Sequence, residues 1–134
     1  MNGSCQVLIA SADPAQCARL GEIAATLELQ SVGCTSLSDA RAQIDRQKFK
    51  VIFCGDDLPD CNLRTALRVL ASATGGVPVI VVSHLAEWER YLRALEAGAF
   101  DYIACPPDAA ETRRILRLAL GQDPPLGRAS RTAA

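Results

Sequence analysis

The stretch that decides the fold is VIFCGDDLPD, residues 51–60. Its first four residues are apolar, which is typical of a parallel strand buried on both faces. A loop ending in Leu58-Pro59-Asp60 follows. Gly55 stands where the strand passes into this loop, so no side chain projects from that position. The sequence therefore predicts a buried strand whose carboxyl end carries no functional group.

Strand and helix patterns alternate five times around this stretch. The predicted strands cover residues 6–10, 31–35, 51–54, 77–83 and 101–105. The predicted helices begin at Asp13-Pro14 and then cover residues 36–48, 62–73, 87–97 and 109–120. Strands that alternate with helices of this length indicate a parallel sheet with helices on both faces. We predict an α/β fold, a flavodoxin-like doubly wound five-stranded parallel sheet in (βα)5 order.

Length and composition indicate one soluble domain. The chain has 134 residues, 49% hydrophobic and 22% charged, with a net charge of −1. This balance favours neither nucleic acid nor a membrane as a partner of the domain. No apolar run approaches the roughly 20 residues that span a bilayer, and the first residues lack a secretory signal. We expect a cytoplasmic protein with one folded domain over residues 1–121 and a disordered tail or linker over 122–134.

The six cysteines are predicted to be free structural thiols. They lie at Cys5, Cys17, Cys34, Cys54, Cys61 and Cys105. They form no C-x-x-C pair, and His84, the only histidine, has no metal-site spacing to any of them. A free cysteine is usually a small buried hydrophobe. We therefore expect neither a metal site nor a cofactor.

Four motifs point to one family. They are Leu58-Pro59-Asp60, the run PVIVVS at residues 78–83, the phrase ALEAGA at 94–99 and the run DYIACP at 101–106. In this order and spacing, the chain from about residue 6 to residue 120 resembles the receiver domains of response regulators. The resemblance implies a part in two-component, or phosphorelay, signal transduction. It also implies a phosphorylation pocket at the carboxyl ends of the strands.

The resemblance places five residues in a degenerate phosphorylation pocket. Ser11 and Ala12 stand where the family carries two acids that hold Mg²⁺, and Gly55 stands where it carries the aspartate that accepts the phosphoryl group. Ser83 keeps the hydroxyl that binds the phosphoryl oxygen. Cys105 replaces the lysine that pairs with the phosphate and cannot supply its charge. Asp13 matches a third family acid but is expected to cap a helix.

These replacements predict a pseudo-receiver without enzymatic activity, because phosphoryl transfer depends on positioning and on charge stabilisation by metal and cation. One alternative is phosphorylation at a displaced acid, Asp56 or Asp57. Side chains alternate along a strand, so a shift by one residue turns a group to the other face, and we expect both to be solvated loop acids. A weak cation site formed by these acids with Asp13 and Asp60 is a lesser alternative.

Two further alternatives remain. The first is a thiol sensor that pairs Cys105 with Cys54 or Cys61, since all three are predicted near one edge of the sheet. The second is a small-ligand pocket at the emptied site, where Gly55 and Ala12 leave space.

The resemblance also suggests where the protein makes contacts. Active receivers signal through helix four, strand five and helix five, and Tyr102 matches the family's aromatic relay residue on strand five. With Thr112, Leu116, Ala119 and Leu120 as the inward stripe, Ile115 lies on the flank of helix five and Leu118 on its far side. A patch of Tyr91, Tyr102, Ile115 and Leu118 is therefore expected to bind a protein partner, an attached output domain or a second copy of the chain.

Overall fold

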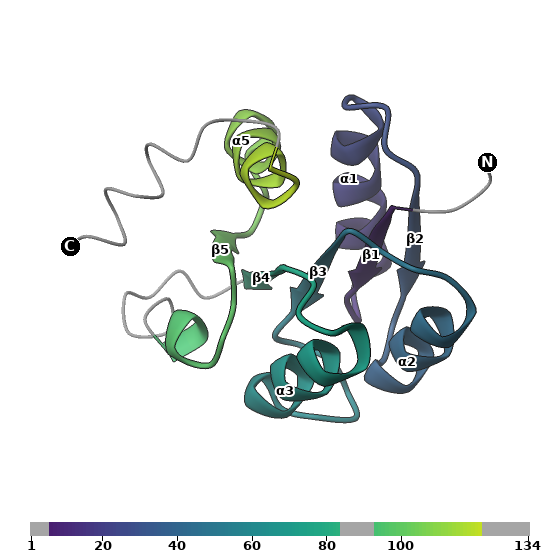
Figure 1. The fold of residues 1–134 in the computed structure, drawn as a ribbon. Helices are drawn as coiled ribbons and strands as arrows, with labels where there is room; N and C mark the ends of the chain where they lie inside the picture. Colours follow the sequence, from purple (N-terminus) through teal and green to yellow (C-terminus); the bar gives the residue numbers. More distant parts are fainter. Residues whose placement is uncertain (1–5, 84–92, 122–134) are drawn as a thin grey trace.

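A computed structural model describes residues 6–83 and 93–121 as a five-stranded parallel sheet flanked by helices (Figure 1). The strands are β1 (Val7–Ala10), β2 (Ser31–Cys34), β3 (Val51–Gly55), β4 (Val79–Ser83) and β5 (Asp101–Ala104). Their order in the sheet is β2-β1-β3-β4-β5, and every neighbouring pair is parallel. The predicted doubly wound fold is confirmed.

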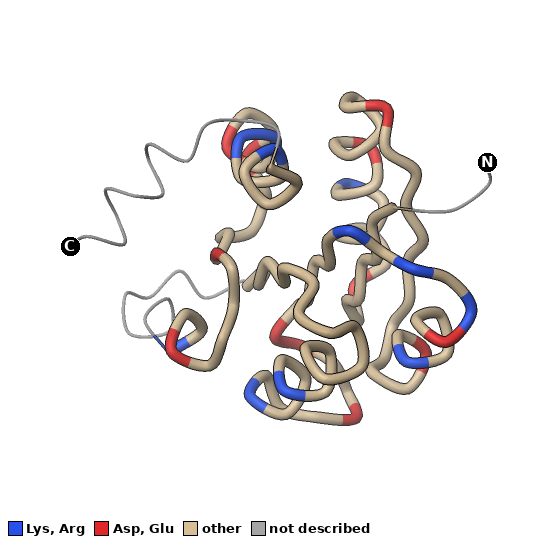
Figure 2. The backbone as a smooth tube through the Cα atoms, viewed as in Figure 1, with Lys and Arg blue, Asp and Glu red and all other residues tan. Residues whose placement is uncertain are grey.

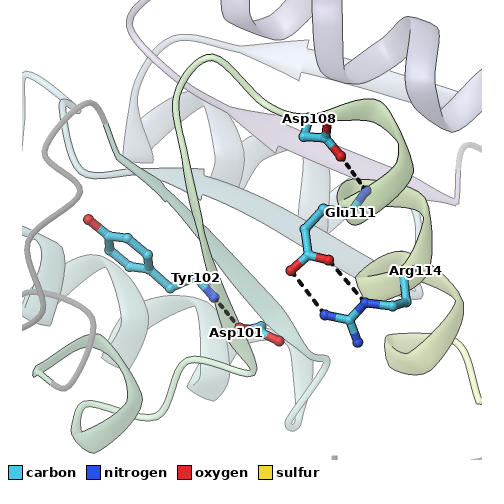
Figure 3. A network of polar contacts seen from close by, with 5 residues as sticks. All are labelled: Asp101, Tyr102, Asp108, Glu111 and Arg114. Carbon is cyan, nitrogen blue, oxygen red and sulfur yellow. Dashed lines mark hydrogen bonds and ion pairs between the residues drawn. The ribbon is translucent and has the colours of Figure 1, made fainter. Parts of the chain in front are cut away.

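The helices begin at side chains that cap their free amides. They are α1 (Pro14–Ala25), α2 (Leu37–Arg46), α3 (Leu63–Thr74) and α5 (Ala109–Ala119). The caps are Asp13, Ser36, Asn62 and Asp108, each of which accepts a hydrogen bond from a first-turn amide. Figure 3 shows the Asp108 cap on the amide of Glu111, at 2.8 Å. The helix predicted over 87–97 is described only from residue 93, with 93–96 helical.

The alternation of side chains along each strand divides the core between the two faces of the sheet. On one face, Leu8, Ile52 and Val81 pack with buried residues of α2 and α3 and with Ala94. On the other face, Ile9 and Phe53 pack with buried residues of α1 and α5. Both faces are therefore covered, which explains why the strand sequences are continuously apolar.

The inward stripe of α5 differs from the prediction. Thr112, Ile115 and Leu116 are buried, with Ile115 only 1% exposed, whereas Leu118 is half-buried. Ile115 belongs to the same core cluster as Phe53, because α5 meets the sheet through positions i, i+3 and i+4 of one turn. The expectation that Ile115 lies in an exposed contact patch is wrong.

Tyr102 lies on the other side of the sheet from this stripe. It is half-buried on β5 and packs against the core cluster of the α2 and α3 face. Tyr102 and Ile115 therefore cannot share one patch, and the predicted group of four does not form. Tyr91, its fourth member, lies outside the described residues.

Within residues 6–83 and 93–121, none of the helices has the length and apolar character needed to cross a bilayer. The tail predicted over 122–134 lies outside the described residues.

Substitution of Ile115 distinguishes a core residue from a contact residue. Ile115→Ala should lower the free energy of unfolding by about 2–5 kcal/mol, because it removes buried methyl groups and leaves a cavity. Denaturant unfolding of the two variants Ile115→Ala and Leu118→Ala measures this. The half-buried Leu118 should give a clearly smaller loss, and equal losses would contradict the placement of Ile115 in the core.

Candidate functional site

The carboxyl ends of four strands bring the predicted pocket residues to one edge of the sheet. Strand pairing sets Ala10 beside Cys54, Gly55 beside Val82 and Ser83 beside Ala104. The residues that end or follow these strands are Ser11, Ala12, Gly55, Ser83 and Cys105, with Asp56 and Asp57 in the loop after β3. The structure therefore assembles the pocket that the resemblance implied, which we call the carboxyl-edge pocket.

The Asp57 carboxylate occupies the space that Gly55 leaves open. A Cβ atom placed on Gly55 would lie 2.5 Å from Asp57 Oδ1 and 3.4 Å from Ser11 Oγ. Standard bond lengths put an aspartate's own carboxylate oxygen about 2.4 Å from its Cβ. Asp57 Oδ1 thus lies about as far from that Cβ position as an oxygen of an aspartate at position 55 would.

Neutral donors hold the Asp57 carboxylate. The Ala12 amide donates to Asp57 Oδ1 at 3.3 Å, and Ser11 Oγ lies 3.5 Å from Oδ2. Among the described residues these are the only hydrogen bonds to this side chain. Asp57 is half-buried, so the idea of an emptied cavity at Gly55 is wrong: a carboxylate from the following loop fills it.

Gln16 joins two of the pocket residues and was not predicted. Its side chain is 5% exposed, and its amide donates to Ser11 Oγ at 3.0 Å. Its carbonyl oxygen accepts a hydrogen bond from the Cys105 thiol. The sequence signal for this role is a polar residue in line with Leu20 and Ile23 on the inward stripe of α1.

Cys105 lies in the pocket as a neutral thiol. Burial, with the carboxylates of Asp56, Asp57 and Asp13 adding to it, raises the pKa of the Cys105 thiol to about 11. Burial also raises the pKa of the Cys54 thiol, which is fully buried, and that of the Cys61 thiol. Since the thiolate is the reactive form, these environments disfavour the thiol-sensor alternative.

Asp56 is held by Ser83 at the same edge. The buried Ser83 hydroxyl donates to Asp56 Oδ2, and the Asp56 amide donates to the Val82 carbonyl at 3.2 Å. Asp56 and Asp57 are loop acids, as expected, but they are half-buried and hydrogen-bonded rather than freely solvated. Strand alternation ends at Gly55, and the loop turns both side chains back over the strand ends.

The other two acids serve as caps. Asp13 accepts from the Ala15 amide at 3.0 Å, as predicted. Asp60 accepts from the amides of Leu37 and Ser38, both at 3.0 Å, and these bonds lower the pKa of its carboxyl below the ordinary value. The Asp60 carboxylate therefore caps the start of α2.

The pocket residues do not match what Mg²⁺ requires. Hard cations bind to several oxygen ligands, including carboxylates. Ser11 and Ala12 offer one hydroxyl, and that hydroxyl already accepts from Gln16 and from the Asp13 amide. Within residues 6–83 and 93–121, no three His, Cys, Asp or Glu side chains are placed to hold a metal ion.

Tyr102 borders a small cavity next to Asp56. This cavity of about 210 Å³ is lined by Asp56, Leu63, Arg64, Arg93, Ala97 and Tyr102. Figure 3 shows the Tyr102 ring directed away from α5, while its amide is bonded to the Asp101 carboxylate at 2.8 Å. Tyr102 therefore borders this cavity from the α3 side of the sheet.

Comparison with known proteins agrees with this geometry. The family model described as the response regulator receiver domain matches residues 7–117. The chain belongs to the response regulator receiver domain family. As a receiver domain it is part of two-component signalling, and its pocket lies at the carboxyl edge that the resemblance indicated.

Relatives support the family and the fold. The transcriptional regulatory protein ZraR of Salmonella typhimurium is 22% identical over 120 residues, which are 90% of this chain and 27% of ZraR. A two-component response regulator from Clostridium difficile has a TM-score of 0.80 at 20% identity, covering 89% of this chain and 98% of that one. A CheY-like receiver domain protein from Methanospirillum hungatei has a TM-score of 0.78 at 21% identity, covering 90% and 96%. This receiver domain thus spans about a quarter of the curated relative.

The bond between Ser83 and Asp56 should contribute to stability. Ser83→Ala should lower the free energy of unfolding by about 1–3 kcal/mol, because it removes the donor to a half-buried carboxylate. Asp56→Asn is the matched control, since its side-chain carbonyl still accepts from Ser83. Denaturant unfolding that gives the same loss for both variants would contradict the assignment.

The reactivity of Cys105 should follow its raised pKa. With a pKa of about 11, roughly one molecule in ten thousand carries the thiolate at pH 7. Alkylation of Cys105 by iodoacetamide should therefore be slower than that of N-acetylcysteine at pH 7 and should rise about tenfold per pH unit up to about pH 10. Peptide mass spectrometry measures both rates, and a fast rate that is level near pH 7 would instead support the thiol sensor.

Proposed function

We propose that this receiver domain is a pseudo-receiver, a non-enzymatic interaction module that works without phosphorylation. The observation that carries the proposal is the Asp57 carboxylate in the space above Gly55, held by the Ala12 amide and Ser11. The acceptor position has no side chain, and the space for one is already filled. The residues of the pocket therefore already form hydrogen bonds with one another.

The electrostatics of the pocket support this proposal. Phosphoryl transfer requires positive charge, from a metal ion or a cationic side chain, where negative charge develops on the phosphoryl oxygens. Cys105 is a neutral thiol bonded to Gln16, and Asp56 and Asp57 add negative charge beside it. Among the described residues that end or follow the strands at this edge, an incoming phosphate would meet two carboxylates and no cationic side chain.

The module would act through contacts with other proteins. The partner is an output domain joined to the chain or a separate protein, and the curated relative, of which this chain covers 27%, leaves ample length for further domains. The proposed surface is formed by helix four, β5 and α5, with Tyr102 and Leu118 as half-buried residues on it. The same surface would serve a homodimer. Neither nucleic acid nor a membrane is proposed as a partner of this domain.

A second candidate function is favoured by the position of Asp57. Because Asp57 Oδ1 lies 2.5 Å from the Cβ position of residue 55, Asp57 is the acid best placed to be a displaced phosphoacceptor. Asp56 is less suited, because its carboxylate is bonded to Ser83. The neutral surroundings of Asp57 weigh against this candidate.

Intact-mass measurement with a small phosphodonor separates the two functions. Acetyl phosphate with Mg²⁺ should leave the mass of the protein unchanged, because no three acids of the described residues are placed to hold a metal ion and Cys105 stands in place of a cation. The variants Asp56→Asn and Asp57→Asn are the controls and should also stay unchanged. A phosphoryl adduct that disappears in Asp57→Asn would overturn the pseudo-receiver proposal and establish the displaced acceptor.

A further inference from the structure

A groove lies beside α3 at the opposite end of the sheet from the carboxyl-edge pocket. We call it the α3 groove; it is bounded by α3, by residues 76–79 and by residues 96–100, and its volume is about 570 Å³. Val79 begins β4 and Phe100 precedes β5, so the groove lies at the amino ends of these strands. None of the pocket residues described above lines it.

The interior of the α3 groove offers apolar surface. The exposed Ala71 lines it from α3 beside the buried Leu67, and Val77 and Phe100, both half-buried, line it from the other segments. Apolar surface that stays accessible in a concave site gains free energy when a partner's side chain covers it. The groove is therefore shaped to receive apolar side chains.

One wall of the groove carries two arginines that pair with no other described residue. Arg64 and Arg68 are exposed on α3 at positions i and i+4, about 6 Å apart along the helix axis. α3 contains no acid, and its two basic positions appear blue in Figure 2. Neither arginine makes a hydrogen bond or ion pair within the described parts of the chain. No described side chain therefore neutralises their charges.

The balance of charge along the groove is positive. The 210 Å³ cavity shares Arg64 and Ala97 with the groove and adds Arg93 and Asp56, so the concave surface continues toward the carboxyl-edge pocket. Its acids are Glu96 on the facing wall and Asp56, whose carboxylate already accepts from Ser83. Three arginines therefore face two acids, one of which is engaged.

We propose that the α3 groove is a docking site for an acidic amphipathic helix of a partner protein. Carboxylates one turn apart on that helix match the spacing of Arg64 and Arg68, and its apolar side chains enter beside Leu67 and Ala71. The site is centred on α3 and borders the proposed surface of helix four, β5 and α5, because residues 96–100 form one of its walls. It goes beyond the proposed function, because it does not depend on whether the pocket can be phosphorylated.

The apolar side chains and the arginines of the groove together favour an acidic amphipathic helix as the bound partner. Exposed ion pairs contribute little affinity on their own, so burial of apolar side chains supplies most of the binding energy. The arginines instead favour an acidic partner over a neutral or basic one and speed its approach. A helix satisfies its own backbone hydrogen bonds, so it can fill the groove without adding a strand to the sheet.

The test is a titration of the whole chain, labelled with ¹⁵N, with a capped helical peptide that carries Glu pairs at i and i+4 beside Leu residues. The amides of Leu67, Ala71, Gly98 and Phe100 should shift. The same peptide with Gln in place of every Glu should bind more weakly. R64E/R68E should weaken binding of the Glu peptide roughly tenfold, since two attractive contacts become repulsive.

Two further variants keep the test decisive. R64Q/R68Q removes the charges without reversing them and should weaken binding less than R64E/R68E. R41E/R46E makes the same change of net charge on α2, where both arginines are exposed, and should leave the affinity unchanged. Absence of binding, equal binding of the Gln peptide, equal weakening by R41E/R46E or shifts confined to β5 and α5 would each overturn the proposal.

Discussion

The carboxylate of Asp57, folded back over Gly55, is the constraint on which the carboxyl edge of this receiver domain depends. It can take that place because glycine leaves the space open and because the Ala12 amide and Ser11 donate to it. Ser11 in turn accepts from Gln16, and Gln16 accepts from Cys105. A chain of hydrogen bonds thus connects β1, β3, α1 and the end of β5.

In this network, neutral hydroxyl and amide donors of the described residues hold the two carboxylates. Asp56 and Asp57 are half-buried, and their partners are hydroxyl and amide groups rather than a cation. Partial exposure to water makes such an arrangement tolerable, because full burial of an unpaired charge would be far more costly. The domain keeps the fold of its family and the hydroxyl of Ser83, while a carboxylate of its own chain engages that hydroxyl. On its surface, the cavity that Tyr102 borders and the α3 groove meet around Arg64 and Ala97.

The fold was predictable because its signals are local. Continuous apolar runs identified the strands, and Asp13 identified the start of a helix. Errors arose where a side chain's direction depends on distant neighbours. Ile115 was assigned to the flank of its helix, yet α5 packs so that this residue enters the core with Phe53. Gln16 was passed over, although it is a polar residue on an apolar stripe and bridges two pocket residues.

By itself the sequence determined the order of the elements and the parallel sheet, because these follow from residue type and periodicity. Only the tertiary structure decided where Asp56 and Asp57 point. Both lie in a loop, where strand alternation no longer sets direction, and their places are chosen by donors that are distant in sequence: Ser83 for Asp56, and Ala12 with Ser11 for Asp57. Those donors come close only when the strands pair.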